Sequence, residues 1–96
     1  MRALLLHGSP ASPDARVEAL DDARLDARGV TVAVTHSSLN YKDGLAVTGT
    51  GKIIRGDFPF VPGIDAAGTV IASGSDRWAE GDGVILTGWG TGETQW

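Results

Sequence analysis

Residues 58–70 read Phe58-Pro59-Phe60-Val61-Pro62-Gly63-Ile64-Asp65-Ala66-Ala67-Gly68-Thr69-Val70, and this stretch decides the fold. It joins Pro-Gly, an acidic residue and Gly-x-Val in one short run. Each proline pushes the residue before it towards extended or polyproline geometry, so we expect a rigid extended segment over Phe58–Gly63. The β-branched residues of Thr69–Ala72 predict a strand soon afterwards. The stretch therefore favours a fold built from short strands.

Further strands are predicted on both sides of this stretch. Val30–His36 alternates, and we expect Val30, Val32 and Val34 to share one face. Gly8–Asp14 holds two prolines and predicts a turn-rich loop, whereas Asp21–Gly29 predicts a polar connection. The predicted strands are Ala3–Leu6, Val17–Leu20 (the weakest), Val30–His36, Thr69–Ala72 and Gly83–Leu86.

A single short helix is predicted over Asn40–Thr48. Tyr41, Leu45 and Thr48 lie at helical spacing, Asn40 or Ser38 can cap the first turn, and Gly49 follows as a stop. Together with the short antiparallel strands, this predicts a mainly β fold, a small and partly open barrel with one short helix.

Composition excludes several classes of function. The chain has 96 residues, a length that fits one domain or part of one. Its formal net charge is -4, and its eight Lys and Arg form no cluster that would bind nucleic acid. It has no Cys, hence no disulfide or thiolate ligand, and this favours the cytoplasm. No apolar run is long enough for a signal peptide or a membrane span, so no membrane partner is expected.

Two glycine-rich runs fail as nucleotide-binding motifs. Thr48-Gly49-Thr50-Gly51-Lys52 lacks the first glycine of a phosphate-binding loop, at Ala46, and has Ile53 where Ser or Thr is required. Gly88-Trp89-Gly90-Thr91-Gly92-Glu93 would place the third glycine of a dinucleotide fingerprint on Glu93. Neither run therefore predicts a dinucleotide site.

Residues 62–70, together with Gly81-Asp82-Gly83-Val84, resemble the signature of the medium-chain dehydrogenase/reductase superfamily, whose catalytic domain is a GroES-like barrel. Three runs resemble its quinone-oxidoreductase-like branch and, more narrowly, the acrylyl-CoA reductase group. They are Ser37-Ser38-Leu39-Asn40-Tyr41-Lys42-Asp43, Gly51-Lys52-Ile53-Ile54-Arg55 and Leu86-Thr87-Gly88-Trp89-Gly90.

The resemblance implies an oxidoreductase that uses NADPH to reduce an enoyl-CoA, similar to acrylyl-CoA, or a quinone. Residues 1–96 would be the N-terminal part of its GroES-like catalytic domain, incomplete relative to the family and without the Rossmann domain that holds the cofactor. We therefore expect the chain alone to be inactive, with self-association or a missing C-terminal half as its partner. The alternatives are a non-enzymatic GroES-like binding module and a truncated, inactive gene product.

The resemblance also implies a reduction without zinc. The zinc-binding Cys and His of metal-dependent members correspond to the Asn40-Tyr41 region and to Ile64, and these side chains are not zinc ligands. Reduction would then need only a hydride and a positioned hydrogen-bond donor. Tyr41, Asp43 and Asp65 are the catalytic candidates.

Each catalytic candidate also has a structural interpretation. Tyr41 could fill the core on the helix face of Leu45, and Asp43 could complete a capping box with Asn40. Asp65 could be an ion-pair partner, since a buried carboxylate is costly unless paired.

The remaining site candidates bind cofactor or substrate. Asn40, Tyr41, Lys42 and Gly44 would lie against the cofactor, although Asn40 could be only a cap and glycine would allow close backbone approach. Arg55 could contact a CoA phosphate, or it could simply be solvated. Trp89 could line the substrate cleft, or it could be part of the core. His7 and His36 are expected to be structural or exposed.

Overall fold

A computed structural model of the full chain describes residues 1–25, 29–88 and 90–92. The described strands pair antiparallel in two separate sheets, β1-β2 and β3-β4-β5, so the predicted mainly β, partly open architecture with one short helix is confirmed. In chain order the elements are β1 (Arg2–Ser9), β2 (Ser12–Ala19), a 3-10 helix (Asp22–Arg24), β3 (Val30–Ser37), α1 (Tyr41–Thr48), β4 (Asp65–Ser73) and β5 (Gly83–Thr87).

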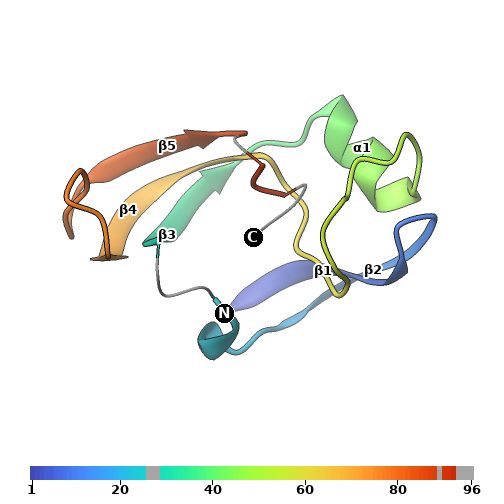
Figure 1. The fold of residues 1–96 in the computed structure, drawn as a ribbon, viewed down its shortest axis with the longest axis horizontal. Helices are drawn as coiled ribbons and strands as arrows, with labels where there is room; N and C mark the ends of the chain where they lie inside the picture. The colour runs from blue at the N-terminus through green and yellow to red at the C-terminus, as the bar shows by residue number, and fades with distance from the viewer. Residues whose placement is uncertain (26–28, 89, 93–96) are drawn as a thin grey trace.

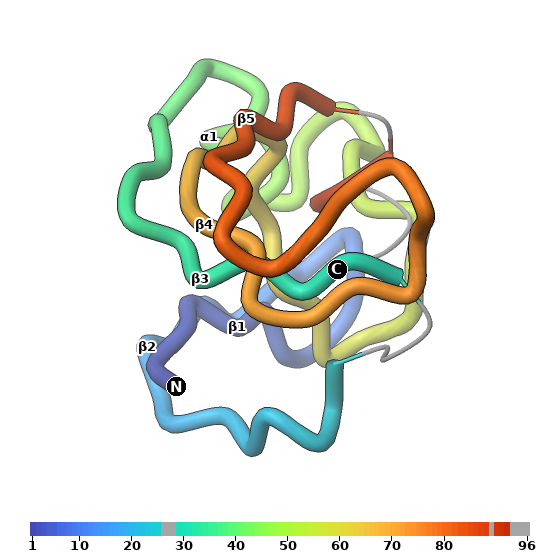
Figure 2. Tube along the Cα trace, turned by 90° about the vertical axis from the view of Figure 1, so that its left-hand side faces the viewer, coloured from blue at the N-terminus to red at the C-terminus, as the bar shows by residue number. Residues whose placement is uncertain are grey.

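The hairpin of β1 and β2 forms a sheet separate from β3-β4-β5. Both views place the hairpin of β1 and β2 below the three-stranded sheet (Figure 1, Figure 2). The helix α1 lies beside the end of the hairpin that carries its turn (Figure 1). One end of the larger sheet is therefore next to the start of α1, while its other end projects away from the helix.

The prediction of a turn-rich loop over Gly8–Asp14 was wrong, because most of these residues belong to the two strands of the N-terminal hairpin. Here β1 and β2 extend to Ser9 and Ser12, so only two residues form the turn, and the weak strand predicted from Val17 is part of the longer β2. Pro13 is tolerated because β2 is an edge strand of a two-stranded sheet, where a missing N–H costs little.

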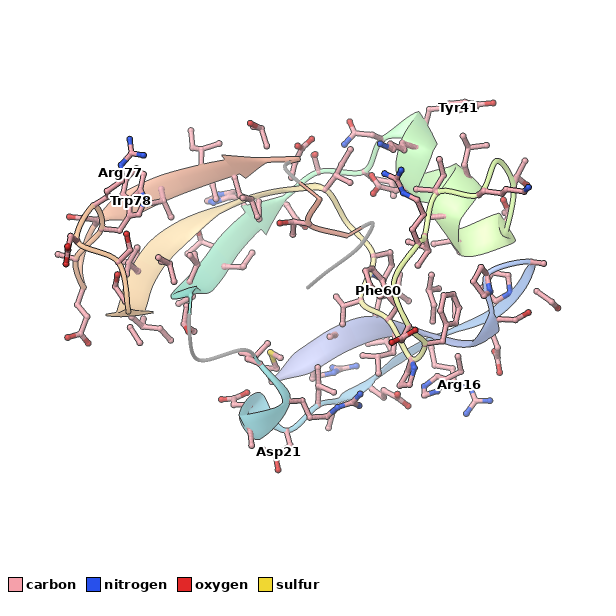
Figure 3. The ribbon with its side chains drawn as sticks, viewed as in Figure 1. Arg16, Asp21, Tyr41, Phe60, Arg77 and Trp78 are labelled. Atoms are coloured by element: carbon pink, nitrogen blue, oxygen red, sulfur yellow. The ribbon has the colours of Figure 1, made fainter. Side chains whose placement is uncertain are left out.

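Residues from three segments form the small core. Leu6 of β1, Ala46 of α1, Ile54 and Phe60 are buried against one another. Leu6 and Phe60 also exchange two backbone hydrogen bonds of 2.8 and 3.0 Å, which attach the segment before β4 to the hairpin. Figure 3 shows Phe60 between the hairpin and the helix. These contacts fix the helix and the segment before β4 relative to the hairpin.

The segment Phe58–Gly63 is less extended than predicted. The chain bends at Phe58 and Pro59, which a cis peptide bond joins, and β-type pairing begins only at Phe60. The strands predicted over Thr69–Ala72 and Gly83–Leu86 are confirmed as parts of β4 and β5.

The strand β3 is confirmed, but its valines do not share one buried face. Its pairing with β4 shifts between Thr31 and Val32 and again between Val34 and His36, and Val34 is exposed. Such irregularities re-aim side chains along a strand. Gly68 of β4 lies close against β3, and a Cβ atom there would collide with the carbonyl oxygen of Ala33.

The helix end explains why the glycines of residues 48–52 do not form a phosphate loop. They follow α1, whereas a phosphate loop precedes its helix. Gly49 adopts the left-handed conformation, and the N–H groups of Gly49 and Thr50 donate to the carbonyls of Ala46 and Leu45 at 3.3 and 2.8 Å. This is a Schellman ending, and it confirms the predicted stop at Gly49.

Candidate functional site

The candidate site is built on the first turn of α1. Asn40 precedes the helix in extended conformation, and its backbone N–H donates to Oδ2 of Asp43 at 2.7 Å. The Asp43 carboxylate is buried, with 6% of the residue exposed. Its burial is compensated by this hydrogen bond and by the positive end of the helix dipole. The predicted capping role of Asp43 is confirmed, and its catalytic role stays a prediction.

A second carboxylate reaches the same helix start from β4. The Oδ2 atom of Asp65 accepts hydrogen bonds from Nδ2 of Asn40 at 3.1 Å and from Oγ of Ser38 at 3.2 Å. The Asn40 Nδ2 group also donates to the Ser38 hydroxyl at 3.0 Å. We call these three residues the Asp65 triangle. Both of these donors are neutral groups, and the ion-pair and acid–base interpretations of Asp65 stay predictions.

The sheet brings the Asp65 triangle together at the ends of three strands. Asp65 begins β4 and lies opposite Thr87, the last residue of β5. Ser37, the last residue of β3, pairs with Ala66, so Ser38 leaves the sheet beside Asp65. Just beyond the end of β5, the N–H of Gly88 donates a hydrogen bond to the carbonyl of Ile64 at 2.7 Å. The helix start is thus anchored to the rigid part of the sheet.

Tyr41, the first residue of α1, does not fill the core. It is 84% exposed, and Figure 3 shows its side chain projecting outward at the start of the helix. The core interpretation of Tyr41 was therefore wrong, because the first helical position points away from the cluster around Ala46. Leu39, on the other side of Asn40, is 87% exposed. An aromatic and an apolar side chain thus flank a polar triangle.

Lys42 and Gly44 continue the same helix turn. Lys42 is half-buried and is engaged in an interaction within the chain. Gly44 is exposed, and a Cβ atom there would meet no atom outside its own helix within 4 Å. The described part of this chain therefore does not require glycine at position 44.

The two substrate candidates lie elsewhere or outside the description. Arg55 is exposed and follows the buried Ile54 in the segment after α1, where it is engaged in an interaction within the chain. Trp89 lies outside the described residues. The two histidines are structural or exposed, as predicted: His7 pairs with Glu18 at 2.6 Å across the hairpin, and His36 contacts its neighbour Thr35.

Comparison with known families gives the site its context. The profile of the alcohol dehydrogenase GroES-like domain matches residues 26–96. The chain belongs to this family. The predicted resemblance to a GroES-like catalytic domain is thereby confirmed, and the Asp65 triangle is a feature of this chain's GroES-like domain.

Relatives of this GroES-like domain are reductases. The chain is 55% identical over 96 residues to the probable acrylyl-CoA reductase AcuI of Escherichia coli. It is 49% identical over 82 residues to the acrylyl-CoA reductase AcuI of Ruegeria pomeroyi. The chain spans only 29% and 24% of these proteins, although they match 100% and 85% of it. The resemblance to the acrylyl-CoA reductase group is confirmed.

A solved structure shares the GroES-like fold closely. The yhdH oxidoreductase from Salmonella enterica, crystallised in complex with NADP, is 54% identical with a TM-score of 0.91 and matches 100% of this chain and 29% of its own. The yhfP protein of Bacillus subtilis, crystallised with NAD bound, is 39% identical with a TM-score of 0.88. A nicotinamide cofactor is therefore a property of these relatives.

The described residues hold no evident metal-ligand set. Among residues 1–25, 29–88 and 90–92, no three His, Cys, Asp or Glu side chains gather in a way that could hold an ion. In the same ranges, no helix has the length and apolar character needed to cross a membrane.

Ser38 is the residue of the site that the sequence reasoning did not identify as functional. The sequence predicts Ser38 only as an alternative helix cap. Its position directly before Leu39 and Asn40 gives no local signal of a bond to Asp65, which lies 27 residues later. Only the register between β3 and β4 brings the two together.

Proposed function

We propose that this chain supplies the acceptor side of an NADPH-dependent reductase, which reduces an enoyl thioester similar to acrylyl-CoA, or a quinone, by hydride transfer. Since the chain spans about 29% of the relatives it matches, the activity is proposed for the whole protein. Two observations support the proposal: relatives with this fold were crystallised with NADP, and the helix start offers a supported, exposed polar surface. The second observation carries it.

The first turn of α1 fits a nicotinamide cofactor. Tyr41 presents an exposed ring, and the backbone at Gly44 is open on the side where a side chain would stand. The flat nicotinamide ring can stack on the Tyr41 ring, and the glycine at position 44 permits the cofactor to approach the helix backbone closely. Asn40, Tyr41, Lys42 and Gly44 would hold this group. When bound, NADPH supplies the hydride, and the acceptor takes up that hydride together with one proton.

The chain's own part is to bind, orient and polarise the acceptor. The Tyr41 hydroxyl would donate a hydrogen bond to the acceptor's carbonyl oxygen, where negative charge develops. The buried Asp43 holds the helix start, so that this donor needs little reorganisation. Leu39 offers apolar surface beside it. Arg55 and Trp89 are proposed to contact the rest of the acceptor, with Arg55 directed to a phosphate.

We propose that no catalytic zinc takes part. Of the positions that correspond to zinc ligands, Asn40 uses its amide N–H groups within the Asp65 triangle, and Ile64 has no donor atom. Asp65 directs one carboxylate oxygen to Asn40 and Ser38. Tetrahedral zinc sites draw on thiolate, imidazole and carboxylate ligands, and the two carboxylates of this neighbourhood, those of Asp43 and Asp65, are both engaged with Asn40.

The proposal is tested by following NADPH oxidation with a panel of acceptors. The protein at its full natural length would be given NADPH with acrylyl-CoA, a saturated acyl-CoA control and a quinone. We expect oxidation with acrylyl-CoA or the quinone and none with the saturated thioester, which has no double bond to reduce. Oxidation with none of the three would contradict the proposal and favour a non-enzymatic binding module.

A further inference from the structure

Asp65 uses one oxygen atom to hold two residues far from it in sequence. Its Oδ2 accepts from the Ser38 hydroxyl at 3.2 Å and from the Asn40 amide at 3.1 Å, which lie 27 and 25 residues earlier in the chain. A general acid or base needs a carboxylate oxygen that is available to the reacting atoms. The geometry instead uses this oxygen to join β4 to the residues that lead into α1.

Asn40 is consequently held from two sides. Its backbone N–H is bound by Asp43, one turn ahead in the helix, and its side-chain amide is bound by Asp65 in the sheet. A hydrogen bond to a charged acceptor is roughly twice as strong as a neutral one. The direction in which the chain enters α1 is thus set by two carboxylates.

Tyr41 depends on this arrangement because it has almost no packing of its own. With 84% of its surface exposed, its place in space comes from the backbone of the helix start rather than from neighbouring side chains. Any loosening of Asn40 therefore passes directly to Tyr41. A residue such as Ala46, buried in the core cluster, would be held in place regardless.

We infer that Asp65 is a positioning residue: together with Ser38 it fixes Asn40 and so aims Tyr41 and the first turn of α1 at the ligand. The assignment replaces the acid–base role predicted for Asp65 by a role exerted through Asn40. The part of the inference that concerns the ligand rests on the proposed function. The link from Asp65 to Asn40 and Ser38, which we call the tether, rests on the three hydrogen bonds of the Asp65 triangle alone.

The sequence provides a direct spectroscopic reporter of the tether. Asn40 is the single asparagine and Gln95 the single glutamine, so a ¹⁵N-labelled chain gives only two side-chain amide signals. The Asn40 signal would be measured for exchange with water, and the Tyr41 backbone N–H for its order parameter. The variants are Asp65→Ala, Ser38→Ala, Ser38→Thr as a conservative rescue, and Ser37→Ala as the matched control.

We expect exchange of the Asn40 side-chain amide to accelerate about tenfold or more in Asp65→Ala, because a hydrogen bond to a charged group is lost. The Tyr41 order parameter should fall from about 0.85 to below about 0.6, while Val70 in the core stays rigid. Ser38→Ala should move both readouts in the same direction. Because this variant removes only a hydroxyl, it still tests the inference if Asp65→Ala fails to fold. Ser38→Thr and Ser37→Ala should match the wild type.

Two results would overturn the inference. One is unchanged Asn40 exchange in both alanine variants, and the other is a lost tether with an unchanged Tyr41 order parameter. A separate titration with NADPH distinguishes this inference from the proposed function. If the full-length wild-type protein does not bind NADPH, the proposed function fails, while the exchange and order-parameter results still decide the role of Asp65.

Discussion

The Nδ2 atom of Asn40 donates a hydrogen bond to Oδ2 of Asp65 over 3.1 Å, although 25 residues separate the two. This bond connects two of the sequence stretches that carry the family resemblance, Ser37–Asp43 and residues 62–70. It makes the helix start part of the sheet edge.

Asp43→Ala should destabilise the fold by about 1 to 2 kcal/mol, because the Asn40 N–H loses its acceptor at a helix start. Urea unfolding followed by circular dichroism measures this change in the free energy of unfolding. Asp57→Ala is the control: Asp57 is exposed, so its substitution should stay within about 0.5 kcal/mol of the wild type. Equal stabilities of the two variants would contradict the capping role.

Alanine at Gly49 and at Gly44 should have opposite effects on stability. Gly49 has a positive φ, and a Cβ there would approach the carbonyl oxygen of Ala11 and Cδ of Pro13, both at 2.8 Å, so its variant should lose at least about 1 to 2 kcal/mol. Gly44 is helical and open, so its variant should gain about 0.5 to 1 kcal/mol. Thermal unfolding of both compares them directly.

The Gly44→Ala variant also tests the ligand surface. If a cofactor approaches the helix backbone at this position, the added methyl group weakens NADPH binding while it strengthens the fold. We expect the dissociation constant of the full-length protein for NADPH to rise about tenfold, for a loss of about 1.4 kcal/mol. Calorimetric titration measures it. Unchanged affinity in a stabilised variant would show that no ligand approaches Gly44.

Tyr41→Phe should leave stability within about 0.5 kcal/mol of the wild type, because the side chain is 84% exposed. Removal of the hydroxyl should lower kcat of the full-length protein by about 10²-fold, typical of one lost donor to a developing oxyanion. Steady-state kinetics with acrylyl-CoA tests this. A variant with wild-type kcat would exclude the hydroxyl as the donor and leave only a stacking role for the ring.

The edge strand β5 should mediate self-association. It borders the three-stranded sheet on one side only, and Ile85 in it is 80% exposed. Exposed apolar edge strands pair with other chains. Sedimentation of the 96-residue chain should therefore show dimers or larger species that Ile85→Lys reduces. Ala79→Lys adds the same charge at an exposed position in the connection between β4 and β5, so it serves as a matched control and should leave the association unchanged. A wild-type chain that sediments as a clean monomer would refute the prediction.

Much of the fold could be predicted from local sequence, because the relevant signals lie within a few residues. The β-branched run Val30–His36 predicts β3, and the spacing from Asn40 to Gly49 predicts α1 with its capping carboxylate. The hairpin of β1 and β2 could not be predicted in this way. Its turn contains Pro10, and a proline near a strand end signals a loop unless the strand lies at an edge.

Apart from Ser38, the residues of the candidate site could be predicted from the sequence, but the hydrogen bonds between them could not. Asn40, Asp43 and Asp65 came from the motifs, yet the bonds of Ser38 and Asn40 to Asp65 depend on the register of β3 against β4, which has two shifts. The exposure of Tyr41 likewise depends on which side of α1 the core occupies. Helical spacing groups Tyr41 with Leu45, but it does not determine how far a residue in the first turn projects beyond the packed cluster.

Hydride reduction at the helix start around Tyr41 is proposed to need no metal. The decisive measurement is the rate of acrylyl-CoA-dependent NADPH oxidation after the full-length protein has been stripped of metal with a chelator. We expect an unchanged rate at a zinc content far below one ion per chain. A rate that disappears on stripping and returns only with added zinc would show that the reaction depends on the metal.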